Sequence, residues 1–187
     1  YQTTQETYAL VEHPEVARHV LAPPASSNRS QQTEYWVQEV YNTRLRWVFR
    51  SLFAYKRHTE LVPMLATLVS LGLSLDEVAG RSYSVNVLRG LLNPPYNLRF
   101  NPQQLVCWLR TAVSFDKVEE AEYVLSLGAH PVNSVGVPRS RAMYELLRTR
   151  YGWVLPRHQH TDMFQRIIGE VDLEWFHLFV ALEPNID

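Results

Sequence analysis

The stretch Val118–Asn133, VEEAEYVLSLGAHPVN, decides the fold class of this chain. Its apolar residues recur at three- and four-residue steps, which predicts a short amphipathic helix. Gly128 follows the last apolar step, and a glycine at this place favours the left-handed backbone conformation with which many helices end. We therefore expect a helix that ends in a sharp turn before the His-Pro pair.

The same helix ending occurs a second time, 56 residues earlier in the chain. Ser70-Leu71-Gly72 matches Ser126-Leu127-Gly128, and the residues around both tripeptides are apolar. A third, looser copy is FVALEPNID (Phe179–Asp187), in which a glutamate stands at the place of the glycine. Each copy follows a helical segment, a short polar break and a second helical segment. Self-similarity of this kind predicts a solenoid of stacked helix pairs.

The rest of the sequence is also predicted to be helical, because no sustained run alternates apolar and polar residues as strands do. A long amphipathic helix is expected from Thr33, a good N-cap residue, to about Arg57. Thr59 is expected to cap the following helix, and Gly72 to end it. Further helices are expected in SYSVNVLRGLL, NPQQLVCWLRTAVSF and PRSRAMYELLRTRYG.

The expected domain organisation follows from these patterns. Residues 1–32 hold a short helical candidate and a linker rich in Pro, Ser and Gln, in which adjacent prolines prevent a helix from continuing. Residues 33–187 form the helical repeat domain, with units at about 33–78, 101–133 and 161–187. The chain begins with Tyr1, so we expect it to be an excised domain or a processed fragment.

The segment Asn101–Asn133 resembles an ankyrin repeat: a first helix, a tight polar turn at Phe115-Asp116-Lys117, a second helix and a Leu-Gly-Ala exit with Pro and Asn. The resemblance extends to Arg44–Val78 and, more weakly, to Thr161–Asp187. It implies an all-α, ankyrin-like solenoid that binds other proteins. The Thr-Pro-Leu-His opening of ankyrin repeats is absent, and the spacing is 56 residues rather than about 33. A generic three-helix α-solenoid is therefore the alternative.

Composition limits the class of protein. Of the 187 residues, 46% are hydrophobic and 12% aromatic, which is typical of a folded chain. The net charge of −1 gives no general attraction to nucleic acid or acidic lipid. No apolar run reaches the ~18 residues of a membrane span, and no signal peptide is visible. The single cysteine, Cys107, excludes an internal disulfide and fits a reducing compartment, so we expect an intracellular location, in the cytoplasm or nucleus.

No catalytic signature stands out, so we expect neither an enzyme nor a cofactor. Cys107 lies beside Trp108 in an apolar segment and is expected to act as a small buried hydrophobe. His158, His160 and Asp162 form the one histidine cluster, but two histidines separated by one residue point in different directions. We expect this cluster to be a loop and not a metal site.

Arginine dominates the basic residues, and only Lys56 and Lys117 are lysines. Between Val78 and Phe115 four arginines occur and no acid, and four more arginines recur over residues 139–150. The spacers also carry aromatic residues that are expected to be exposed: Tyr83, Tyr96, Phe100, Tyr151 and Trp153. Solvated arginines with compensating ion pairs explain this pattern, and so does a docking surface, because Arg and aromatic residues are enriched at binding hot spots. The predicted partner-binding residues are His130, Asn133, Arg139, Arg141, Arg81, Tyr83, Tyr96 and Arg99.

The sequence is thus interpreted as an adaptor or scaffold that docks a partner protein with an acidic or mixed surface, without a membrane. The alternative is a structural subunit of a larger assembly that contacts nucleic acid through the arginines, a less favoured partner at this net charge. An enzyme with an unrecognised active site is the third class.

Overall fold

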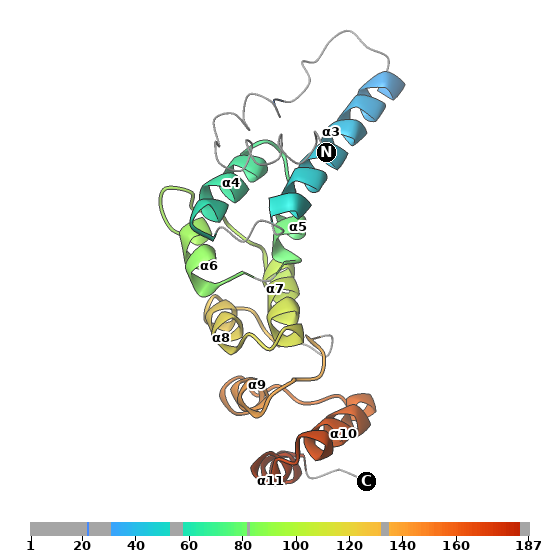
Figure 1. The fold of residues 1–187 in the computed structure, drawn as a ribbon, viewed down its shortest axis with the longest axis vertical. Helices are drawn as coiled ribbons and strands as arrows, with labels where there is room; N and C mark the ends of the chain where they lie inside the picture. The colour runs from blue at the N-terminus through green and yellow to red at the C-terminus, as the bar shows by residue number, and fades with distance from the viewer. Residues whose placement is uncertain (1–21, 23–30, 53–57, 82, 132–134, 184–187) are drawn as a thin grey trace. The chain divides into compact units, whose positions relative to one another are not determined.

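The computed structural model describes residue 22 and residues 31–52, 58–81, 83–131 and 135–183. All regular structure in these ranges is helical (Figure 1), so the predicted all-α class is confirmed. The chain divides into two compact units, one of Tyr1–Val78 with Asn86–Arg99 and the other of Ala79–Val85 with Phe100–Asp187. The expected helix and linker before residue 31 lie outside the described residues, apart from Ala22.

The first unit contains α3 (Gln31–Leu52), α4 (His58–Ser70) and most of α5 (Leu75–Ala79) and α6 (Val85–Leu92). The sequence predicted three of these helices and missed α5, which has only five residues. The predicted N-caps are wrong: Thr33 lies inside α3 and Thr59 inside α4, because each helix includes residues before its threonine.

The core of the first unit lies where α3, α4 and α6 bury their apolar residues. The Tyr41 hydroxyl of α3 donates to the Leu71 carbonyl at the end of α4, at 2.6 Å. Gly90 of α6 lies so close to α4 that an added Cβ would stand 3.0 Å from a methyl carbon of Val62. The glycine thus allows the two helices to approach. The fully buried side chains here include Leu45, Phe49, Met64, Leu65, Leu68, Leu88 and Leu91.

The second unit contains the helix pair α7 (Pro102–Ser114) and α8 (Val118–Ser126), then α9 (Arg141–Glu145) with the π-helical turn η3 (Leu146–Arg150). A short 3₁₀ turn, η4 (Arg157–Gln159), leads into a second pair, α10 (His160–Glu170) and α11 (Leu173–Leu182). Both pairs lie where the sequence predicted a helix, a polar break and a second helix. Asn101 and Gln104 form a capping box at the start of α7, and Pro102 occupies its first turn.

The repeated Ser-Leu-Gly tripeptide ends both α4 and α8 in the same way. Gly72 has a φ of +106° and Gly128 a φ of +97°, as the sequence predicted. At both sites the glycine amide donates three residues back, and the next amide donates five residues back, which is a Schellman motif. Asp116 ends α7 with the same pattern at a φ of +56°. Glu183, which stands at the third predicted ending, has a φ of −119° and no such turn.

Two of the aromatic residues that were expected on the surface belong to the core. Tyr83 is 4% exposed and Trp153 is 3% exposed, so this expectation was wrong for both. Tyr83 packs edge-on against Trp108 with ring centroids 5.9 Å apart, and Phe100 contacts the same indole at 4.4 Å. Cys107, next to this cluster in sequence, is half-buried and not fully buried as predicted.

Candidate docking surface

The helix pair α10–α11 has a buried inner face, through which α11 contacts α9 and η3. Met163, Ile167, Trp175 and Phe179 are all buried on this face. The ring of Phe179 meets that of Tyr144 from α9, with centroids 6.0 Å apart. Burial of this face is what the apolar stripe of each helix predicts.

Polar contacts reinforce the same packing at the end of α11. The Tyr144 hydroxyl donates to Glu183 Oε1 at 3.2 Å, and Arg148 Nη2 donates to the Leu182 carbonyl at 2.7 Å. Arg148 Nε lies 3.1 Å from Glu183 Oε1, as an ion pair and not as an aligned hydrogen bond. Burial and the neighbouring Glu183 charge raise the pKa of the Tyr144 phenol, because both disfavour the phenolate. The end of α11 is thereby tied to η3.

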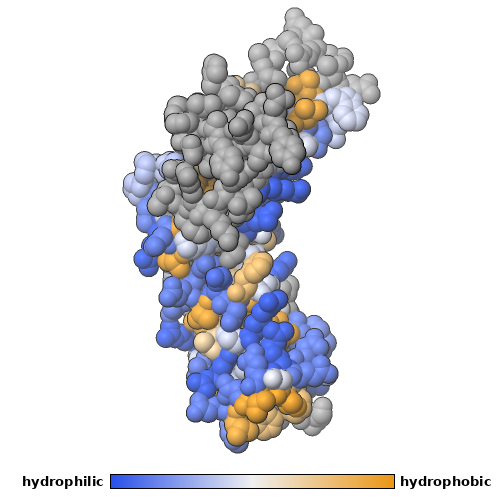
Figure 2. Space-filling view, in the orientation of Figure 1, coloured by the Kyte–Doolittle hydropathy of each residue, from blue (hydrophilic) through white to orange (hydrophobic). Residues whose placement is uncertain are grey.

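The outer face of the same helix pair is also apolar, and it is exposed. Val171 is 82% exposed and Leu173 72%, which is unusual for aliphatic residues so close together. The ring of Phe164 on α10 lies 6.0 Å from that of Phe176 on α11 and so bridges the two helices on this side. Figure 2 shows hydrophobic residues gathered on this part of the surface. The exposed members are Phe164, Ile168, Val171, Leu173 and Val180.

A groove runs along this outer face, which we name the α10–α11 groove. It has a volume of about 290 Å³ and is lined by Ile167, Ile168, Val171, Asp172, Leu173 and Phe176. Asp172 caps α11 by accepting a hydrogen bond from the Trp175 amide at 2.9 Å, so its carboxylate is engaged in the helix start. The remaining lining is aliphatic or aromatic. Such a surface stabilises a complex by burying apolar area.

Carboxylates lie at the turn between α10 and α11, at one end of the groove. The residues of α10 and α11, together with the two that join them, include four acids, two histidines and one arginine, Arg166. Glu170 is exposed in the last turn of α10, where the helix dipole already gives a negative potential. Arg141 pairs with Glu174 and lies 3.9 Å from Asp172, and the hydrogen bond to Glu174 raises the pKa of its guanidinium.

Several arginines form ion pairs within the chain, including three of the four from residues 139–150 that were considered for a docking surface. Arg141 pairs with Glu174, Arg148 with Glu183 and Arg150 with Glu122 in the second unit. In the first unit Arg46 pairs with Glu77 at 3.1 Å. For these four arginines, the contacts support the explanation by compensating ion pairs. Arg141 is thus a half-buried ion-pair partner rather than a free contact residue.

The other predicted partner-binding residues are distributed over both units. His130, Arg81 and Arg139 are exposed in the second unit. Tyr96, half-buried, and Arg99, exposed, belong to the first unit. Tyr83 lies in the core, where burial raises the pKa of its phenol, and this removes it from the surface. Asn133 lies outside the described residues.

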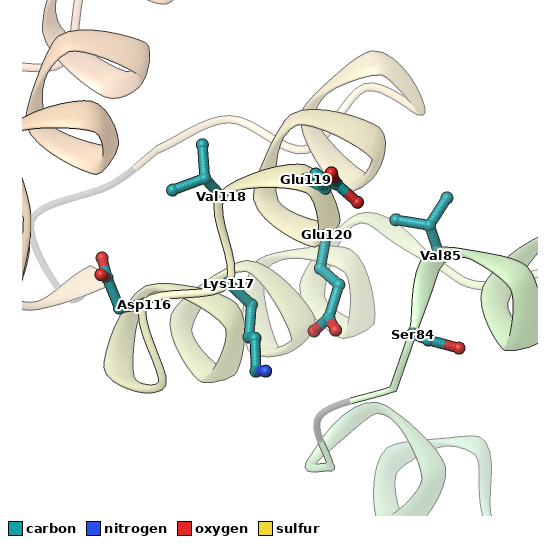
Figure 3. A pocket seen from close by; sticks show the side chains of 7 residues that line it. All are labelled: Ser84, Val85, Asp116, Lys117, Val118, Glu119 and Glu120. Carbon is teal, nitrogen blue, oxygen red and sulfur yellow. The ribbon is translucent and has the colours of Figure 1, made fainter. Parts of the chain in front are cut away.

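A second hollow lies beside the turn between α7 and α8 (Figure 3). Its volume is about 320 Å³, and it is lined by Ser84, Val85 and the run Asp116–Glu120. The side chains of Lys117 and Glu120 extend to the same side, whereas Asp116 points away. Asp116 instead accepts a hydrogen bond from Ser140, the N-cap of α9, at 2.7 Å. Every lining side chain is at least partly exposed, so the hollow is an open polar surface.

Within the histidine cluster only His160 is packed, whereas His158 and Asp162 are exposed. His160 Nε2 lies 3.2 Å from the Leu155 carbonyl, and its ring meets Phe179 edge-on at 6.1 Å. In the described part of the chain, no group of three or more His, Cys, Asp or Glu side chains could hold a metal ion. The same part contains no helix with the length and apolar character needed to cross a membrane.

Comparison of the chain with protein-family models, with curated proteins and with solved structures finds no match in any of the three. The ankyrin-like resemblance therefore stays a prediction from the sequence.

The sequence reasoning missed the α10–α11 groove as a site. A signal was present, because α10 carries apolar residues on two adjacent faces, at 163 and 167 and again at 164 and 168. A helix with one buried face needs only one such stripe. The segment LEWFHLFVAL of α11 is similarly apolar around most of its circumference.

Proposed function

We propose that this chain is a protein–protein interaction module, an adaptor or scaffold, which docks a partner in the α10–α11 groove. The observation that carries the proposal is the exposed outer face of this helix pair. Its inner face already holds α11 against α9 and η3, whereas Ile168, Val171 and Leu173 on the outer face are left exposed in the described part of the chain. Exposed apolar patches of this kind mark interaction sites in folded proteins.

The proposal includes an ankyrin-like solenoid as its architecture. The two Schellman endings spaced 56 residues apart support it, since they mark equivalent points of two helix pairs. In a solenoid each pair uses one face for the preceding unit and the other for the next. A solenoid helix pair has an apolar outer face of the kind seen on α10–α11 where another surface packs against it.

Site-specific photo-crosslinking from Leu173 tests the proposal, because this side chain is 72% exposed beside the groove. A photoreactive residue at 173 is expected to give discrete adducts in a lysate of the source cells, and Ile168→Ser is expected to abolish them. The matched control carries the photoreactive residue at Val40 of α3, which is similarly exposed at 67%.

A third bait with the photoreactive residue at Arg139 locates the docking surface. Adducts at 139 alone would keep the interaction function and move it to the arginine-bearing loop. Adducts at none of the three positions would refute the interaction function. Circular dichroism of each variant confirms that the helical fold is retained.

A further inference from the structure

We propose that the partner element in the α10–α11 groove is an amphipathic α-helix with a row of aliphatic residues and flanking Lys or Arg residues. This inference rests on the proposed docking function and adds the chemistry of the partner. Three features of the groove carry it: its construction from two helices, its acidic surroundings and the conformation of Val171.

Two helices form the walls of the groove, and the apolar residues on this side follow helical spacing, all of them exposed except the half-buried Phe176. Phe164 and Ile168 are four residues apart on α10, and Leu173, Phe176 and Val180 follow at steps of three and four on α11. A third helix places its own side chains between such rows, which is the helix-in-groove mode of recognition. Extension of a sheet by an added strand requires a strand edge, and the described residues contain none.

The charge at the end of α10 is the reason for expecting Lys or Arg residues beside the aliphatic row of the partner helix. Glu170 stands at the end of α10 beside the groove, where both its carboxylate and the helix dipole attract a cation. No basic residue lies in that last turn of α10 to compensate it. A Lys or Arg of the partner that reaches past Val171 meets this negative end. A purely apolar helix would leave it unpaired.

The same charges disfavour a second copy of this chain as the occupant. In a two-fold dimer built on this face, each groove would meet the identical surface of its partner. Glu170, which no basic residue in its turn compensates, would then lie at the interface in both copies, whereas Asp172 and Glu174 are offset by Arg141. Like charges brought together across an interface weaken the complex.

Val171 places an apolar side chain at the end of the groove in an unfavourable backbone conformation. Its φ of +55° lies in the left-handed region, which β-branched residues rarely adopt. The next residue, Asp172, is the N-cap of α11, so the turn holds Val171 between the two helices with 82% of its surface exposed. Asn adopts this conformation more readily and is polar, so Val171→Asn removes the apolar contact without threatening the fold.

Two designed, fluorescein-labelled helical peptides test the inference with the full 187-residue chain. One carries Leu at positions i, i+3, i+4 and i+7 with Lys on both flanks, and the other carries Glu in place of every Lys. Fluorescence anisotropy is expected to show micromolar binding of the Leu/Lys peptide, and binding weaker by about tenfold or more for the Leu/Glu peptide. Ile168→Ser and Val171→Asn are each expected to weaken the Leu/Lys peptide, whereas Val40→Ser, the matched control, leaves it unchanged.

Charge reversal at Glu170 gives the sharpest result. Glu170→Lys suits the negative end of α10 and so does not endanger folding. It is expected to weaken the Leu/Lys peptide by about fivefold and to strengthen the Leu/Glu peptide. The Leu/Lys affinity of the wild type is also expected to fall as salt is raised from 0.1 to 1 M, because the screening length shortens from about 10 Å to about 3 Å.

Binding of neither peptide, equal binding of both, or an unchanged preference in Glu170→Lys would each overturn the inference. Self-association in sedimentation velocity that disappears in Ile168→Ser would overturn it in favour of a second copy. Crosslinked adducts at 173 alongside a failed peptide assay would leave the docking function standing and refute the basic helix alone. Failure of both assays would refute both.

Discussion

The ion pair between Arg148 and Glu183 is expected to respond unequally when either partner is removed. The Arg148 side chain is 22% exposed, whereas that of Glu183 is 6% exposed. After Glu183→Gln, the guanidinium retains the Leu182 carbonyl at 2.7 Å and partial access to water. After Arg148→Met, the Glu183 carboxylate stays buried, with the Tyr144 hydroxyl as its one remaining partner among those described above.

The unequal burial of the two side chains sets how much free energy of unfolding each substitution should cost. Removing one member of a buried pair costs about 3–5 kcal/mol, because the other charge is left without compensation. We expect about 3 kcal/mol for Arg148→Met, and only about 1–2 kcal/mol for Glu183→Gln because solvent reaches the remaining guanidinium. The double variant leaves no buried charge at this site, so it should cost about 2 kcal/mol rather than the sum of the single costs.

Urea unfolding followed by circular dichroism measures the free energy of unfolding of all four proteins. The m-values should agree across the set, which shows that each variant unfolds from an equally compact native state. An Arg148→Met variant no less stable than Glu183→Gln would refute the unequal-burial argument. Strict additivity in the double variant would show that the two side chains do not interact across the contact between η3 and α11.

Three further predictions concern backbone conformation and burial. Gly72→Ala and Gly128→Ala should each lower the free energy of unfolding by about 1 kcal/mol, because alanine is strained at their positive φ; unchanged urea midpoints would contradict the Schellman assignment. Gly169→Ala should stabilise the chain by about 0.5 kcal/mol in the same assay, since this glycine lies inside α10 and an added Cβ would meet nothing within 4 Å. The pKa of Tyr83 is raised above its ordinary value of 10.0 by burial, so above pH 10 the unfolded chain releases a proton that the folded chain keeps. Stability should therefore fall with rising pH by up to about 1.4 kcal/mol per unit from this group, and Tyr83→Phe should show a shallower loss in alkaline urea titrations.

The sequence predicted the features that depend on neighbouring residues. The helix pairs α7–α8 and α10–α11 were predicted because apolar periodicity and short polar breaks are local signals. The positive φ of Gly72 and Gly128 followed from the same reasoning, since a glycine after an apolar helical run has few other roles. The five-residue α5 was missed because one turn and a half carries too little periodicity to recognise.

Features that depend on distant residues were not visible in the sequence. Tyr83 was placed on the surface because it lies in a polar spacer, but Trp108, 25 residues away, provides an apolar partner. The contacts of Arg141, Arg148 and Arg150 join residues 28–35 positions apart in sequence, and no local sequence pattern predicts them. The sequence therefore left two explanations open for the arginines of residues 139–150, compensating ion pairs and a docking surface, and three of the four are paired with acids from other parts of the chain.

The same logic explains why the α10–α11 groove was found in the structure alone. Periodicity shows that a helix has two apolar stripes, but it does not show which stripe another element covers. Here Tyr144 and Arg148 cover the inner stripe by contacts to α11 and the residue after it, and the outer stripe of Phe164, Ile168 and Leu173 is left exposed. The ring and ion contacts of the covered face hold α11 in place, and so they hold the exposed face of the same helix. A preformed groove of this kind lowers the entropy that binding must overcome, because its own side chains are already held in place.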